Sequence, residues 1–326
     1  MSTTLSTRGD RDIGVVMMLE PGRYEWSGVL LISTLLAFAQ DDIGIWAYCR
    51  RGLIDQLHPS TLDFLDRHGV RLEPIDPAFQ VTYPQGNKLY ACAAPRAARA
   101  TILMDTDMVM IRPARLAEAI HPGCVSGRNT SGWMWGKTVE EWRAAYASVG
   151  LEPPRLRMFR PDGSYVPVSL AAAFVTYDTP DFGAIWRDTA LEIEDRRLAR
   201  GIYPTLDQIS LPVAAVRAGL RPTLIDSIWN KGGVIGRGRM HSVVVHHYQK
   251  PERLLGSDYK WATDAVLGEF AGHDSVEALI AFYEANGARP PEVDGNEGYW
   301  DTVIRPQRQA DAPHDGSARP HPAKDG

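Results

Sequence analysis

The sequence has 326 residues, of which 44% are hydrophobic and 23% are charged, so the chain can bury a sizeable core and is not a largely disordered or fibrous protein. Its 35 basic and 40 acidic residues give a net charge of -5, and no basic block occurs in the body of the chain. This balance disfavours nucleic-acid binding through backbone phosphates.

The cysteines and the apolar stretches bear on the compartment. Cys49, Cys92 and Cys124 are an odd number at no metal-like spacing, which indicates buried thiols in a reduced, cytoplasmic protein. Residues 1–11 lack the apolar centre of a secretory signal, and the longest apolar stretch, 29–39, is too short to span a bilayer. We therefore expect a soluble protein without a membrane span.

Apolar runs that fit buried strands alternate with helical patterns over the first third of the chain. Strands are expected at 13–19, 43–49, 70–75 and 100–104, and helices at 24–39, 62–68 and 87–99, the last broken or kinked at Pro95. This alternation predicts right-handed βαβ units around a parallel sheet, so the expected fold class is α/β.

The alternation continues downstream. A strand is expected at 171–177, helices at 182–199 and 209–218, the second opened by residues 205–208, and a last strand at 242–248. We expect one domain over 12–304, between a disordered leader at 1–11 and a disordered tail at 305–326, where no apolar pattern remains.

Two carboxylates, Asp105 and Asp107, follow directly on the strand expected at 100–104. An isolated carboxylate is costly to bury unless it is paired or binds a metal, and hard divalent ions prefer carboxylate oxygens. Ligands of open α/β sheets lie beyond the carboxyl ends of strands, where this pair falls. The pair therefore indicates a Mg²⁺ or Mn²⁺ site, although Asp-x-Asp alone also fits a solvated turn or a helix cap.

Phosphate-binding glycine motifs are missing after the first expected strand, since neither Gly-x-Gly-x-x-Gly nor a Walker loop occurs there. A bound diphosphate would therefore depend on a metal held by Asp105 and Asp107. The last expected strand ends in His246 and His247. Neighbours on a strand point to opposite faces, so at most one of these two imidazoles can reach a given site.

Two further features have both a structural and a functional interpretation. Asp207 lies in the first turn of a helix that Thr205 would cap, where a carboxylate favours the helix dipole without any catalysis. Trp133, Trp135 and Trp142 fit either a loop that stacks on a ligand or a secondary core.

A series of short motifs occurs in a fixed order: Asn87 and Lys88, then Asp105 and Asp107, then Asp207 and Gln208, then Trp229 and Asn230, then His247, Tyr248, Lys250 and Pro251. This order resembles the GT-A-fold glycosyltransferases, most closely the retaining group that includes glycogenin and the lipopolysaccharide hexosyltransferases. The resemblance spans roughly residues 13–255 and implies a Rossmann-like nucleotide-diphospho-sugar transferase fold with a mainly parallel central sheet flanked by helices.

The resemblance implies a metal-dependent enzyme that moves a hexose from a nucleotide-diphosphate sugar, with UDP as the expected nucleotide, to a saccharide or other hydroxyl acceptor. Asp105, Asp107 and His247 would bind Mn²⁺ or Mg²⁺, and Asp105 would also reach the ribose. Lys250 would contact the diphosphate.

Other members of the motif series would surround the donor. Asp207 and Gln208 would lie near the donor sugar as the catalytic residues, and Asn87 and Lys88 would belong to the donor-binding set. Tyr24, which follows the first strand, would lie against the nucleobase, an assignment that rests on position alone.

The sequence departs from the family pattern at two places. The sugar-pocket strand usually carries an Asn-Ser/Ala-Gly segment, whereas residues 169–173 read Ser-Leu-Ala-Ala-Ala. A glycine after His-Tyr is also missing, because Gln249 and Lys250 follow at once. The first departure leaves open a non-catalytic or degenerate nucleotide-sugar-binding scaffold.

The stereochemical outcome also stays open at this point. In a retaining transfer Asp207 or Gln208 would steady a cation-like sugar, whereas an inverting transfer needs a carboxylate that deprotonates the acceptor. A sugar-phosphate nucleotidyltransferase is disfavoured because residues 19–23 carry one glycine and an acidic residue instead of a glycine-rich basic loop. An aspartyl-nucleophile phosphatase would carry its Asp-x-Asp pair after the first strand, not in the middle of the chain.

Overall fold

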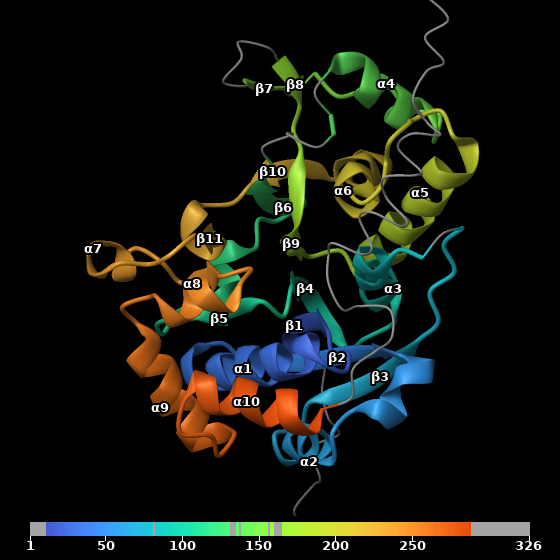
Figure 1. Ribbon diagram of the computed structural model, residues 1–326. Coiled ribbons are helices and arrows are strands. Elements are labelled where there is room, and N and C mark those ends of the chain that lie inside the picture. The colour runs from blue at the N-terminus through green and yellow to red at the C-terminus, as the bar shows by residue number, and fades with distance from the viewer. Residues whose placement is uncertain are drawn as a thin grey trace, which may run out of the picture.

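The computed structural model describes residues 11–80, 82–130, 135–136, 138–155, 157–159 and 165–287 (Figure 1). A seven-stranded sheet with the order β10-β6-β9-β4-β1-β2-β3 runs through the protein. Its strands are β1 (Arg11–Met18), β2 (Ile43–Arg50), β3 (Arg71–Ile75), β4 (Ala98–Met104), β6 (Cys124–Asn129), β9 (Leu170–Tyr177) and β10 (Arg221–Leu224). Neighbours pair in parallel except for β9, which is antiparallel to β4 and β6. The expected α/β class with a mainly parallel sheet is confirmed.

The central strands are buried on both faces. Val15 and Met17 of β1 pack into one core layer and Val16 into the other, and Ile102 and Leu103 of β4 divide in the same way. Successive side chains of a strand point to opposite faces, and here both faces are covered by helices. This is why these strands appear in the sequence as continuous apolar runs.

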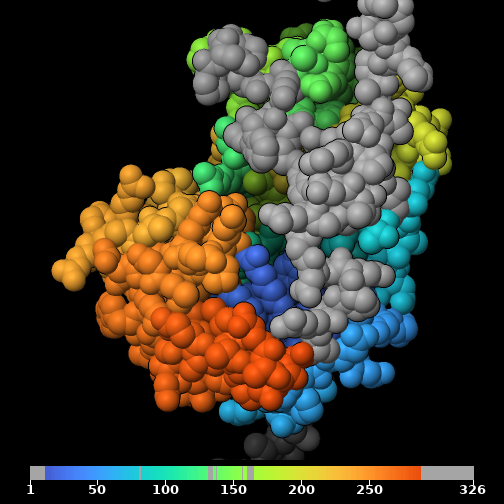
Figure 2. Space-filling view, viewed as in Figure 1, coloured from blue at the N-terminus to red at the C-terminus, as the bar shows by residue number. Residues whose placement is uncertain are grey.

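Helices form a layer on each face of the sheet. One layer contains α1 (Arg23–Phe38), α2 (Pro59–Arg67), α9 (Lys260–Phe270) and α10 (Val276–Asn286). The other contains α3 (Asn87–Ala93), α4 (Val139–Ala147), α5 (Phe182–Arg196) and α6 (Leu206–Arg217). Figure 1 shows α10 lying alongside α1, and in Figure 2 the C-terminal helices (orange) form one side of the visible surface.

Smaller elements complete the described part of the chain. A three-stranded sheet consists of β5 (Met108–Met110), β12 (Val245–His247) and β11 (Lys231–Gly232), and a two-stranded sheet of β7 (Arg157–Phe159) and β8 (Tyr165–Pro167). The short helices are α7 (Arg237–Met240), α8 (Pro251–Leu255) and the 3-10 helices Arg51–Gln56, Pro84–Gly86, Leu116–Ala119 and Ser227–Trp229.

The order of the strands places a crevice at one edge of the sheet. The chain passes from β1 through β2 to β3 and then returns to the other side of β1 to form β4. Such a reversal opens a crevice at the carboxyl ends of the two central strands. β6 and β10 run in the same direction as β4 and end at the same edge, whereas β9 runs the opposite way and begins there.

Three expected elements differ from the structure. The helix expected at 87–99 ends at Ala93, and the chain has entered β4 by Ala98, because proline at position 95 cannot continue a helix. The helix expected at 182–199 ends at Arg196, and Arg197 follows in the left-handed conformation with φ of 54°. The strand expected at 242–248 is limited to Val245–His247, where it pairs with β5.

The expected leader and tail lie outside the described residues, except for Arg11, which begins β1. Cys49, Cys92 and Cys124 are free and buried, as expected. None of the helices in the described ranges combines the length and apolar character needed to cross a bilayer.

Candidate active site

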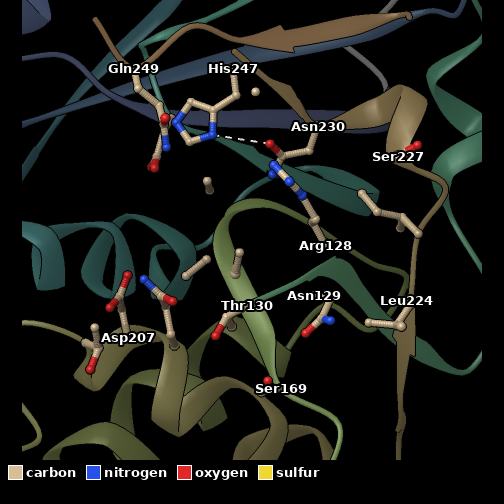
Figure 3. Close-up of a pocket in the computed structure, with 18 of the residues that line it drawn as sticks. Arg128, Asn129, Thr130, Ser169, Asp207, Leu224, Ser227, Asn230, His247 and Gln249 are labelled. Atoms are coloured by element: carbon tan, nitrogen blue, oxygen red, sulfur yellow. Dashed lines mark hydrogen bonds between the residues drawn. The ribbon is translucent and has the colours of Figure 1, made fainter. Parts of the chain in front are cut away.

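A cavity of about 940 Å³ opens at the carboxyl edge of the sheet (Figure 3). The first residues of β9 line it together with the ends of β4 and β6, the start of α6, and Asn230, Gly232 and Gly233. Asp105, Asp207, Gln208 and His247, all expected from the sequence, are among its lining residues. The strand directions explain why these residues lie together, because every one of these segments begins or ends at the same edge of the sheet.

Asp105, Asp107 and His247 converge beside this cavity. Each offers a ligand atom within 4.8 Å of the other two, and His247 Nε2 lies 3.1 Å from Asp107 Oδ1. The antiparallel pairing of β5 with β12 sets His247 opposite Met108, and the Tyr248 backbone N–H donates to the Asp107 carbonyl at 3.1 Å. The expected approach of a distant imidazole to the Asp pair is confirmed.

His246 points to the opposite face of β12. It is fully buried, and its ring nitrogens meet the Tyr259 hydroxyl and the Gly233 carbonyl. Burial lowers the pKa of His246 to about 4. Because strand neighbours alternate between faces, His247 is the histidine that reaches the Asp pair.

Asn230 fixes the orientation of His247. Its side chain is buried, and its Oδ1 accepts a hydrogen bond from His247 Nδ1–H at 3.2 Å (Figure 3). A hydrogen bond from Nδ1–H leaves Nε2 as the ring nitrogen that faces the two carboxylates, as in metal-binding histidines whose other nitrogen is hydrogen-bonded. Asn230 was expected only as part of a motif, and no feature of its own segment signals this role.

Asp105, Asp107 and His247 shift one another's pKa values. Burial raises the pKa of Asp105, with Lys88 opposing it. For Asp107 the effect of burial is outweighed by His247, so the pKa of Asp107 is lowered. Burial would lower the pKa of His247, but the Asp107 carboxylate outweighs it and the pKa is raised. The partly buried carboxylates of Asp105 and Asp107 therefore favour a positively charged group beside them.

The donor atoms suit a divalent cation. Two carboxylates and an imidazole form a ligand set that Mn²⁺ or Mg²⁺ accepts, with positions left for water and phosphate oxygens. Adjacent ligands of an octahedral ion with bonds of about 2.1 Å lie roughly 3 Å apart. The 3.1 Å separation of His247 Nε2 and Asp107 Oδ1 matches that spacing.

Lys88 on α3 joins this group to Asp207. Its Nζ lies 2.7 Å from Asp105 Oδ1 and 3.7 Å from Asp207 Oδ2, and it donates to the Ala172 carbonyl at 3.0 Å. Burial would lower the pKa of Lys88, but the two carboxylates outweigh it and raise the pKa. Lys88 therefore stays charged and holds the end of β4 against the start of α6.

Asp207 is held from its other side by Tyr83. The Tyr83 hydroxyl donates to Asp207 Oδ1 at 2.7 Å and accepts from the Asp207 backbone N–H at 2.9 Å. Burial raises the pKa of Asp207, although Lys88 and Tyr83 oppose the shift. Thr205 occupies the N-cap position of α6 as expected, but its side chain makes no capping hydrogen bond and its hydroxyl donates to the Ile202 carbonyl instead.

The remaining expected residues lie around this centre. Asn87 is buried, donates to Glu20 Oε1 at 3.3 Å, and lines a second cavity of about 390 Å³. Tyr24 lies near the Asp pair at the start of α1, where burial and the Asp107 charge raise its pKa. Lys250 is exposed at the start of α8 and is not among the described residues that line either cavity.

The loop after His247 has a backbone conformation typical of glycine, although the glycine of the family pattern is missing there. Gln249 has φ of 62°, in the left-handed region that glycine adopts readily. Its carbonyl accepts from Arg23 at the start of α1, and its side chain accepts from Arg253. Gln249 and Arg253 thus line the cavity at the corner where the sequence placed Lys250.

Small residues form the floor of the cavity where the family pattern has asparagine. Ala171, Ala172 and Ala173 of β9 line it, as expected for this stretch. Trp135 and Trp142 are buried with ring centroids 5.1 Å apart, so they belong to a core that also borders the cavity, and Trp133 lies outside the described residues.

The outer wall was not expected from the sequence. Arg128, Asn129 and Thr130 line it at the end of β6, together with Leu224 at the end of β10 and Ser227 beyond it. The one available signal was that polar side chains follow an apolar strand. This signal points to the cavity only once it is known that β6 ends at this edge.

Comparison with solved structures finds glycosyltransferases at low sequence identity. The bifunctional glycosyltransferase WbbM, in its apo structure, matches at 12% identity and a TM-score of 0.44 over 94% of this chain and 53% of that one, so the chain spans about half of WbbM. An active-site mutant of LgtC matches at 11% identity and a TM-score of 0.49, over 86% of this chain and 98% of that chain. The galactosyltransferase LgtC in complex with donor and acceptor sugar analogs matches at 12% and 0.47 with the same coverage.

Sequence comparison gives the family. No curated protein matches the chain. A family model described as the Rhodobacterales glycosyltransferase domain matches residues 15–219, more than half of the chain, including Asp105, Asp107 and Asp207. His247 lies beyond the matched residues. The glycosyltransferase resemblance is thus confirmed, and the chain belongs to the Rhodobacterales glycosyltransferase domain family.

Proposed function

We propose that the protein transfers a hexose from a nucleotide-diphosphate sugar, with UDP as the nucleotide, to a hydroxyl acceptor, and that it needs a divalent cation. The observation that carries this proposal is the convergence of Asp105, Asp107 and His247 beside a cavity that also contains Asp207 and Gln208. In the transfer, the bond from the anomeric carbon to the diphosphate oxygen breaks, a bond to the acceptor oxygen forms, and the hydroxyl proton is released.

Asp105, Asp107 and His247 would hold the cation, with Asn230 keeping the imidazole in the ligating tautomer. When bound, Mn²⁺ or Mg²⁺ would neutralise the charge that develops on the departing diphosphate. Tyr24 against the nucleobase, Asn87 near the donor and Lys250 at the diphosphate stay predictions.

The charges in the cavity favour retention of configuration. Inversion needs a carboxylate free to deprotonate the acceptor hydroxyl. Among the described lining residues the only carboxylates are Asp105 and Asp207, and both face Lys88. Gln208 offers a neutral amide beside Asp207, which suits a role in steadying a cation-like sugar after the diphosphate has left.

The structure around β1 argues against the nucleotidyltransferase alternative. Glu20 follows β1, is buried, and pairs with Arg50 at 2.9 Å while it accepts from Asn87. A carboxylate at this position repels a triphosphate, which that class of enzyme binds through a glycine-rich basic loop.

The test is release of UDP from a panel of UDP-hexoses with Mn²⁺, repeated with excess chelator. We expect release that depends on the metal and that is lost in Asp107→Ala and His247→Ala. The matched controls are Asp66→Ala and His241→Ala, which change exposed side chains outside the cavity.

Calorimetry with Mn²⁺ and UDP distinguishes the alternatives. Metal-dependent binding without any UDP release indicates a non-catalytic scaffold. Binding that is as tight in Asp107→Ala as in the unmodified protein would remove the metal site from the proposal.

A further inference from the structure

Arg128 reaches into the cavity from the carboxyl end of β6. Its guanidinium lies against β11, because a Cβ added to Gly232 would stand 3.5 Å from Arg128 Nη1. In Figure 3 the side chain points toward Asn230, the residue that orients His247. The missing side chain at Gly232 leaves room for this cation on the cavity wall.

No described residue is hydrogen-bonded to or paired with the Arg128 side chain. The other cationic side chains of the cavity are engaged: Lys88 faces the two carboxylates of the lining, Asp105 and Asp207, and Arg253 donates to a neighbouring glutamine. A guanidinium presents its donors as a planar fork that fits a carboxylate or a phosphate with two parallel hydrogen bonds. Arg128 is exposed to the cavity, so its donors are available to an anionic group on a ligand.

The surroundings of Arg128 suit a sugar other than the donor. Asn129, Ser227 and Leu224 lie to one side of it in Figure 3, away from Asp207 on the other side. Together they offer hydrogen-bonding groups for hydroxyls and an apolar surface for a ring face. A cavity of about 940 Å³ is near the upper end of the roughly 300–1,000 Å³ of small-molecule sites, so it has room for an acceptor beside the donor.

We infer that the acceptor is an acidic sugar, with a carboxylate or phosphate that Arg128 binds through its guanidinium fork. The inference rests on the proposed transferase function and names the acceptor class. Asn129 and Ser227 bind hydroxyl groups of this acceptor, and Arg128 sets its position relative to the donor without taking part in bond breaking.

The test compares acceptors that differ only in charge. Methyl glycosides of glucose, galactose and N-acetylglucosamine, together with the matching uronic acids and 6-phosphates, are offered with Mn²⁺ and the best UDP-hexose, and kcat/KM is measured. An acidic series should be used about 10- to 100-fold better than the neutral one. The series preferred identifies carboxylate or phosphate as the recognised anion.

Variants assign the preference to one side chain. Arg128→Gln should abolish it, and Arg128→Lys, which keeps the charge without the fork, should retain part of it. Arg237→Gln is the control, because Arg237 is an exposed arginine on α7 outside the cavity lining, and it should keep the full preference.

Equal use of acidic and neutral acceptors, or use of none, overturns the inference. An Arg128→Gln variant whose KM rises for the UDP-hexose and not for the acceptor also overturns it, because Arg128 would then contact the donor. Binding of UDP and slow donor hydrolysis without acceptor report on the proposed function separately. If both occur and no acidic preference is seen, only the acceptor class is wrong.

Discussion

Replacing Lys88 with methionine would leave two carboxylates without the ammonium between them. Asp207 has a side chain only 4% exposed, whereas Asp105 is 28% exposed, so most of the cost arises at Asp207. Removing one partner of a buried ion pair costs about 3–5 kcal/mol, and the Ala172 carbonyl also loses its donor. We expect Lys88→Met to lower the free energy of unfolding by about 3–5 kcal/mol at pH 7.5.

The cost should depend on pH. Burial already raises the pKa of Asp207, and loss of the opposing Lys88 charge raises it further. A carboxyl whose pKa is higher in the folded than in the unfolded protein favours folding below its unfolded pKa, and this contribution is lost as pH rises through the folded pKa. The deficit of Lys88→Met should therefore be smaller at pH 5 than at pH 7.5.

Urea unfolding followed by tryptophan fluorescence at both pH values measures the effect. Lys260→Met is the control, since Lys260 also pairs with two carboxylates, Asp264 and Glu277, each at 2.7 Å, but no member of this group is as buried as Lys88 or Asp207. It should cost less than about 1 kcal/mol. Adding Asp207→Asn to Lys88→Met should restore part of the stability. A cost for Lys88→Met as small as that of the control, without rescue, would refute this reasoning.

Three other substitutions address separate contacts. Asn230→Ala should weaken Mn²⁺ binding about 10- to 100-fold in calorimetry, because His247 loses its orienting acceptor, and unchanged affinity would contradict that role. Tyr83→Phe should lower the free energy of unfolding by about 1–3 kcal/mol, because two groups of Asp207 lose their partner, and a neutral effect in urea unfolding would argue against the contact. Burial raises the pKa of Glu25, so the stability of Glu25→Gln relative to the unmodified protein should increase from pH 5 to pH 8, and a decrease would reverse our assignment.

The cluster of Asp105, Asp107 and His247, our candidate metal ligands, could be predicted from the sequence because its residue types stand out. Carboxylates at 105 and 107 directly after an apolar strand, and histidines at the end of another, are unusual in a core and mark the edge of an α/β sheet. Period-two alternation also showed that one of His246 and His247 would face away.

Other parts of the site depend on contacts that no single segment reveals. The direction of β9 is set by its partners β4 and β6, and an apolar run reads the same either way. Asn230 gains its role from His247, which lies 17 residues later. The left-handed backbone at Gln249, directly before Lys250, is uncommon for a residue with a side chain, so the course of this loop could not be predicted.

The reversed direction of β9 separates changes in the segment between β6 and β9 from changes in the cluster of Asp105, Asp107 and His247. Because β9 enters the sheet at the cavity, the segment between β6 and β9, with α4 and the β7–β8 pair, joins the protein beside Asn129 and Ser169, where we propose that the acceptor binds. The candidate ion ligands are held elsewhere, by the pairing of β5 with β12. If the proposed function holds, insertions or exchanges in that segment would change the acceptor while Asp105, Asp107 and His247 keep their positions.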